Sequence, residues 1–106
     1  MIVTFDKEYL RELYITGKCS DKKHRFQPDV IKRYKRCVDT LVASHNVESL
    51  YKHNSLNYEV LSGDKKGLSS VRVTSKYRIE FTVKVVADTE TIVSVCNIIE
   101  LSNHYK

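Results

Sequence analysis

Hydrophobic residues recur at helical spacing in the first third of the chain. Four of them share one predicted helix face: Tyr9, Leu10, Leu13 and Tyr14. Asp6 is placed to cap the start of this helix, and Gly17 is placed to end it. Residues 18–27 are polar and basic, and they include the predicted loop 21–25. The pattern therefore predicts a short helix followed by a charged connection.

A second helix is predicted to begin at Pro28, a residue that suits the first turn of a helix. Its apolar face is formed by Ile31, Tyr34, Val38 and Leu41. Between them lie four cations, Lys32, Arg33, Lys35 and Arg36, which form an outer face. Such faces are more often solvated than bound to RNA, and both readings remain open. Residues 46–57 have no clear pattern, although Val47–Tyr51 favours a helical turn.

After Asn57 the hydrophobic period changes from 3.6 to 2, which indicates strands. The predicted strands are residues 2–5, 58–61, 68–74, 77–86 and 91–101. Breaker-rich residues 62–67 form one turn, residues 75–76 a tight second turn, and residues 87–90 a third. In the strand 77–86, the apolar set Ile79, Phe81, Val83 and Val85 alternates with the polar set Arg78, Glu80, Thr82 and Lys84.

This order of elements predicts an α+β fold in a single domain spanning residues 1–106. An N-terminal strand is followed by two helices and then by a three-strand antiparallel meander that forms a small sheet. One sheet face should pack on the helices. The other face should carry the polar residues of the alternation and be free to act as a working surface.

Composition favours a polyanionic partner and a reducing compartment. Eighteen Lys and Arg residues outnumber thirteen Asp and Glu residues, which gives a net charge of +5. The cysteines are an odd set without a CxxC pair, and Cys37 and Cys96 should be buried as small hydrophobes. No signal peptide, membrane span or metal-ligand spacing is visible, so we expect a cytoplasmic protein without metal or membrane.

RNA cleavage by 2′-hydroxyl attack requires a base, an acid and cations that stabilise the phosphate, and side chains can supply all three. Arg72 and Arg78 should be close neighbours across a hairpin, with Glu59 on the preceding strand. His104 and Tyr105 follow the last strand and could fold back towards the sheet. On spacing alone, exposed strand charges such as Arg78 and Glu80 are more often solubilising, and a histidine near a terminus is more often idle.

Two segments close together in the second half of the chain form one block, Tyr58-Glu59-Val60-Leu61-Ser62-Gly63-Asp64-Lys65-Lys66-Gly67-Leu68-Ser69-Ser70-Val71-Arg72-Val73 and Lys76-Tyr77-Arg78-Ile79-Glu80-Phe81. This block resembles the central block of the RelE superfamily. The resemblance is to HigB and YoeB toxins in particular, and Asn103-His104-Tyr105-Lys106 resembles their C-terminus. Two departures are visible. Ser62 stands where many HigB-like members have lysine, and Asn103-His104-Tyr105 stands where many end Asp-Tyr-His, which leaves the register of these three residues open.

The resemblance implies a role for each matching residue. Glu59 would be the general base, and Arg72 and Arg78 would hold the scissile phosphate. His104 would be the general acid, and Tyr105 would position or stack on a nucleotide. The RNA backbone would be bound by three lysines, Lys65, Lys66 and Lys76. The implied reaction needs no metal ion or other cofactor and yields a cyclic phosphate.

The implied function is that of the toxin of a type II toxin–antitoxin system, a ribosome-dependent messenger RNA endoribonuclease that inhibits translation. Its partners would be the ribosome, messenger RNA and a cognate antitoxin, a helix-turn-helix protein of the HigA type. Two alternatives keep the fold without catalysis: a ParE-type poison of DNA gyrase, and an RNA-binding or ribosome-binding module. Glu59, Arg78 and His104 together favour cleavage, and the tyrosines are too scattered to indicate a stacking platform.

Overall fold

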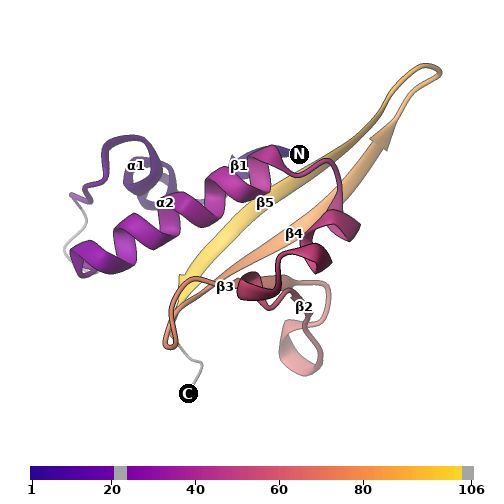
Figure 1. Cartoon of the computed structure of the whole chain (residues 1–106). Coiled ribbons are helices and arrows are strands. Elements are labelled where there is room, and N and C mark those ends of the chain that lie inside the picture. The colour runs from indigo at the N-terminus through magenta and orange to yellow at the C-terminus, as the bar shows by residue number, and fades with distance from the viewer. Residues whose placement is uncertain (21–23, 104–106) are drawn as a thin grey trace.

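A computed structural model of the chain describes residues 1–20 and 24–103, in which two α-helices pack on one face of a five-stranded sheet (Figure 1). The strands are β1 (Ile2–Phe5), β2 (Glu59–Val60), β3 (Ser69–Arg72), β4 (Arg78–Ala87) and β5 (Ile92–Ser102). The helices are α1 (Glu8–Thr16) and α2 (Pro28–Ala43), with 3-10 turns η1 (Val47–Lys52), η2 (Asn54–Leu56) and η3 (Gly63–Lys65). The predicted α+β class and the helical turn after residue 46 are confirmed.

The sheet has the strand order β1-β5-β4-β3-β2. β1 pairs with β5 in parallel, and all other neighbours are antiparallel. The antiparallel run therefore has four strands, and the prediction of three was wrong. The strand predicted at residues 58–61 is present as β2 and belongs to this run, but it has only two residues, Glu59 and Val60, which pair with Ser70 and Ser69.

Gly17 and Pro28 determine the end of α1 and the start of α2. α1 ends at Gly17, whose left-handed backbone (φ 72°) places its N–H on the carbonyl of Leu13, as predicted. The predicted cap at Asp6 was wrong, because Lys7 occupies that position and no side chain caps the helix. Pro28 begins α2, as predicted. Of the charged connection, residues 21–23 lie outside the described residues.

The core lies between the helices and the inward face of the sheet. Tyr34 is fully buried, and its hydroxyl donates to the carbonyl of Leu10 at 2.7 Å, which ties α2 to α1. The sheet and the residue that follows β3 contribute the buried residues Val71, Val73, Ile79, Phe81, Cys96, Ile98 and Leu101. As predicted, Cys37 and Cys96 are buried, and burial raises their thiol pKa values to about 11 and about 12. In the described part of the chain, neither helix is long and apolar enough to cross a membrane.

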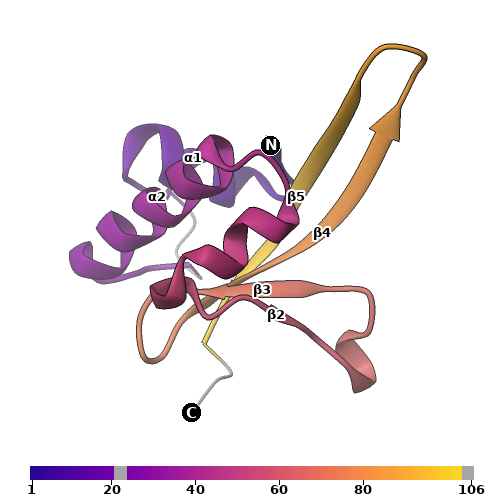
Figure 2. The ribbon, with the colours of Figure 1, turned by 45° about the vertical axis from the view of Figure 1, so that its right-hand side comes forward.

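The β4–β5 hairpin extends beyond the helices and projects away from the rest of the molecule (Figures 1 and 2). Residues 78–81 of β4 are all buried, whereas residues 84–87 are all exposed. Val85 belongs to the apolar set of this strand, but its side chain lies on the projecting part and is 61% exposed. Alternation gives the face of a strand to which a residue points, but it does not indicate where the covering layer ends.

Candidate RNA-binding and active site

The polar residues of the central strands share one face of the sheet, opposite the helices. The register places Glu59, Ser70 and Glu80 in one row across β2, β3 and β4. Arg72 and Arg78 are direct partners in a neighbouring row of the same face. The sequence-based prediction that both arginines lie together on the polar face is therefore confirmed.

This polar face is more enclosed than we expected from the sequence. Ser70, Arg78, Glu80 and Ser102 are all buried, and Glu80 is only 2% exposed. Lys65, in η3, reaches Glu80 with its Nζ 2.5 Å from Oε2. The reading of Arg78 and Glu80 as exposed, solubilising charges is thus wrong. Burial of ionic groups is costly unless they are paired. Here Glu80 is paired with Lys65, and Arg78 is hydrogen-bonded to Ser70.

Contacts with side chains and with the backbone fix the guanidinium of Arg78. Its Nε donates to Ser70 Oγ at 2.9 Å, and its Nη2 donates to the carbonyl of Asn57. The same Nη2 lies 3.8 Å from Oε2 of Glu59, whose side chain is 58% exposed. A carboxylate thus stands at the solvent edge beside a nearly buried guanidinium. This arrangement can offer a proton acceptor and a phosphate-binding cation to one ligand.

Asn57 supplies its carbonyl from an unusual backbone conformation, with φ of 44° in the left-handed region. It is the one residue other than glycine with positive φ in the described chain. Asparagine tolerates this conformation better than most residues, which is the local reason that the chain can turn here into β2. Sequence reasoning missed Asn57, Ser70 and Glu80 as members of the site. Two signals in the sequence could have indicated them. Asn57 stands directly before Tyr58, where the hydrophobic period changes, and Ser70 lies two residues before Arg72, on the same face of the strand.

The remaining cations surround this arrangement at different depths. Arg72 is exposed, next to Arg78, and such a like-charged pair is unfavourable unless an anion lies near it. Lys66 and Lys76 are exposed in turns, whereas Lys65 is partly buried by its contact with Glu80. The structure therefore brings Glu59, Arg72 and Arg78 together and places the lysines in turns outside them.

Two predicted site residues, His104 and Tyr105, lie outside the described residues. The described geometry thus concerns the predicted base and the phosphate-binding groups. Within residues 1–20 and 24–103, no group of three or more His, Cys, Asp or Glu residues is placed to hold a metal ion.

Comparisons with known proteins point to one family. The model of the HigB-like toxin family, described as the RelE-like toxin of type II toxin–antitoxin system HigB, matches residues 3–94. This match includes Glu59, Arg72 and Arg78. No curated protein sequence matches the chain significantly.

Two solved structures are similar to the chain. A YoeB/ParE toxin from Agrobacterium tumefaciens has a TM-score of 0.60 at 14% identity, with 99% of this chain and 100% of that chain covered. A YoeB dimer from Staphylococcus aureus has a TM-score of 0.46 at 17% identity, with 99% and 98% covered. The first likeness supports the fold. The family match extends over most of the sequence, and the chain belongs to the HigB-like, RelE-related toxins of type II toxin–antitoxin systems, a class whose members act with an antitoxin partner.

Proposed function

We propose that this toxin is an endoribonuclease that cuts messenger RNA on the ribosome, in the cytoplasm, and thereby inhibits translation. The observation that carries the proposal is the contact between Glu59 and Arg78, at 3.8 Å, with Arg72 as the cross-strand partner of Arg78. A carboxylate at the solvent edge of two guanidinium groups suits a reaction that moves a proton next to a phosphate.

In the proposed reaction, Glu59 accepts the proton of a ribose 2′-hydroxyl. The 2′ oxygen forms a bond to phosphorus, and the bond from phosphorus to the 5′ oxygen of the next nucleotide breaks. The products are a 2′,3′-cyclic phosphate and a 5′-hydroxyl, with His104 as the donor of the proton to the leaving oxygen. Arg78 and Arg72 stabilise the charge on the phosphate in the transition state. Tyr105 positions a neighbouring nucleotide, and no metal ion or cofactor takes part in these steps.

The ribosome supplies orientation in this proposal. The Glu59 side chain is 58% exposed, so the site by itself does not hold an RNA strand in one geometry. A messenger RNA that is held with the 2′ oxygen in line with the leaving oxygen reacts much faster than a mobile strand. Lys65, Lys66 and Lys76 would bind the RNA backbone around the site.

The antitoxin is proposed to be a helix-turn-helix protein that covers the basic surface around the site. A chain with a net charge of +5 presents a favourable target for an acidic segment. If that segment occupied Arg72 and Arg78, it would exclude RNA and thereby neutralise the toxin.

The test is expression from a tightly regulated promoter, followed by primer extension to map messenger RNA ends. The wild type should arrest growth and create new 5′ ends within translated regions, whereas Glu59→Gln and His104→Ala should do neither. Glu90→Gln, an exposed carboxylate in the β4–β5 turn, is the matched control and should behave as wild type. New ends that persist in Glu59→Gln would remove Glu59 as the base. Growth arrest with intact messenger RNA would favour a toxin that acts by binding, such as a gyrase poison.

A further inference from the structure

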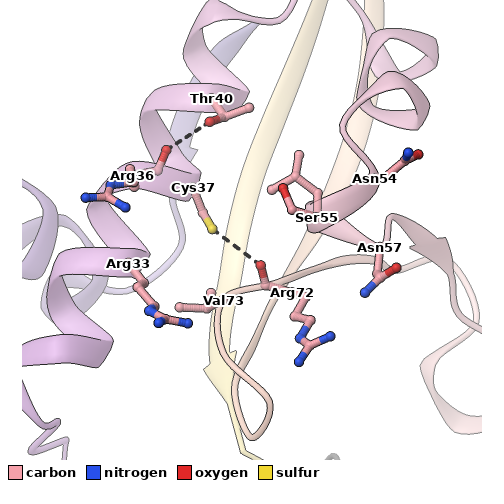
Figure 3. A pocket seen from close by; sticks show the side chains of 10 residues that line it. Arg33, Arg36, Cys37, Thr40, Asn54, Ser55, Asn57, Arg72 and Val73 are labelled. Atoms are coloured by element: carbon pink, nitrogen blue, oxygen red, sulfur yellow. Dashed lines mark hydrogen bonds between the residues drawn. The ribbon is translucent and has the colours of Figure 1, made fainter.

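A cationic pocket lies between α2, the turn η2 with Asn57 after it, and the end of β3 (Figure 3). Its volume of about 620 Å³ lies within the usual range for small-molecule sites. Arg33 and Arg36 line it from α2, and Arg72 lines it from the end of β3. The described lining residues include no acidic residue, so the pocket carries three positive charges without an internal counterion.

The charges of these arginines are only weakly compensated. Arg33 pairs with Asp29 at 3.4 Å, but both side chains are more than half exposed, and such pairs contribute little. Among the described residues, the guanidinium groups of Arg36 and Arg72 have neither an ion pair nor a hydrogen bond. Arg78, by contrast, is held by Ser70 and Asn57. The available positive charge therefore gathers at the pocket and favours an anionic ligand.

Polar and apolar groups accompany the charge. Ser55 and Asn57 line the pocket with a hydroxyl and a side-chain amide, and Val73 contributes an apolar wall (Figure 3). Guanidinium groups bind phosphate, whereas an amide and a hydroxyl can bind the edge of a base. A space of this size with this mixture fits a nucleotide better than an isolated phosphate ion.

The pocket adjoins the proposed cleavage site through two shared residues. Arg72 lines the pocket and is the direct cross-strand partner of Arg78. Asn57 also lines the pocket, and its carbonyl accepts a hydrogen bond from Arg78. Cα atoms of cross-strand partners lie about 4.5–5.5 Å apart, so one strand of RNA can contact both arginines.

We propose that the arginine-lined pocket binds the nucleotide next to the scissile phosphate in single-stranded RNA. The identity of the polymer rests on the proposed ribonuclease function. The pocket holds this neighbouring nucleotide while Arg78 holds the phosphate that reacts. Arg72 lies between the two and contacts the RNA backbone where it passes from the pocket to Glu59.

The first experiment measures binding of an uncleavable RNA, a short single strand with 2′-O-methyl sugars, by fluorescence anisotropy at several salt concentrations. The double variant Arg33→Gln/Arg36→Gln should bind about tenfold more weakly, and its salt slope should fall by about 1.4, or 0.7 for each lost phosphate contact. The matched control, Lys32→Gln/Lys35→Gln, removes the same charge from the same helix outside this pocket and should retain the wild-type slope. Equal losses in both variants, or no loss in the first, would overturn the proposal.

The second experiment distinguishes RNA from free nucleotides as the ligand of the pocket. It also distinguishes failure of the pocket proposal from failure of the proposed cleavage reaction. If millimolar adenosine monophosphate displaces the RNA from the wild type as completely as unlabelled RNA does, the pocket is a site for free nucleotides and the RNA assignment is overturned. Glu59→Gln should retain RNA binding and lose cleavage. Normal cleavage by Glu59→Gln, together with weak binding by Arg33→Gln/Arg36→Gln, would refute the proposed chemistry and support the pocket.

Discussion

Lys65 and Glu80 form an ion pair that fastens η3 to β4, with Nζ of Lys65 2.5 Å from Oε2 of Glu80. The Glu80 side chain is 2% exposed, whereas that of Lys65 is 36% exposed. The lysine thus lies across a buried carboxylate on the same sheet face as Arg78. This pair connects the stability of the sheet to the position of a basic turn beside the candidate site.

Removal of Lys65 should therefore destabilise the fold. Lys65→Met leaves the carboxylate of Glu80 without this partner, and we expect a loss of about 1–3 kcal/mol in the free energy of unfolding. Urea denaturation measures it. Lys66→Met, the exposed neighbour, is the control and should change stability by less than about 0.5 kcal/mol. Equal effects from the two substitutions would show that the Lys65–Glu80 contact does not support the sheet.

The left-handed backbone at Asn57 predicts that glycine at this position is less destabilising than valine. Asn57→Gly should retain stability, because glycine adopts positive φ without strain. Asn57→Val should cost about 1–2 kcal/mol, because a β-branched residue is strained there. Thermal unfolding of both variants tests the order. A valine variant as stable as the glycine variant would mean that the turn is conformationally relaxed.

The buried thiols predict loss of stability in alkaline solution. Burial raises the pKa values of Cys37 and Cys96 to about 11 and about 12, above the value of about 8.5 for an unfolded thiol. The unfolded state therefore releases protons first, so stability is fully present below pH 8.5 and falls as the pH rises towards 11. The slope should be up to about 1.4 kcal/mol per pH unit for each thiol.

Urea denaturation between pH 8 and pH 10 measures this slope. Cys96→Ala removes one of the two thiols and should roughly halve it, whatever its effect on stability at neutral pH. A variant with an unchanged slope would assign the alkaline loss to other groups, among which the buried Tyr34 hydroxyl also has a pKa raised by burial.

Two apolar residues of β4 should respond very differently to truncation. Phe81 is fully buried, and Phe81→Ala should cost about 3–5 kcal/mol. Val85 is 61% exposed, and Val85→Ala should change stability by less than about 0.5 kcal/mol. Chemical denaturation of the pair is a direct test, since the alternating pattern alone places both residues on the same side of the strand. A large loss for Val85→Ala would mean that the projecting hairpin is covered in solution.

Sequence patterns identified the parts of the fold that depend on local chemistry. Gly17 ended a helix, Pro28 began one, and the alternation around Ile79 and Phe81 identified the central strand. Hairpin geometry was sufficient to pair Arg72 with Arg78. These features depend on residues close in sequence, and so a single chain can indicate them.

Features that depend on distant segments were not predictable in the same way. The burial of Glu80 requires Lys65 to arrive from η3, and the exposure of Val85 depends on where the helices end. The contact of Arg78 with the Asn57 carbonyl depends on a single backbone angle before β2. The parallel pairing of β1 with β5 joins the two ends of the sequence, and no local pattern indicates it.

That parallel pairing also determines when the toxin can assemble. Val3 lies opposite Cys96, so in the described sheet β1 pairs only with β5, a strand far from it in sequence. Closing so long a loop is entropically costly, and contacts of this sequence separation slow folding. Until β5 has been synthesised, β1 lacks the neighbour with which it pairs in the described sheet. β1 is thus the first strand to be made, and it must wait for β5 before it joins the sheet.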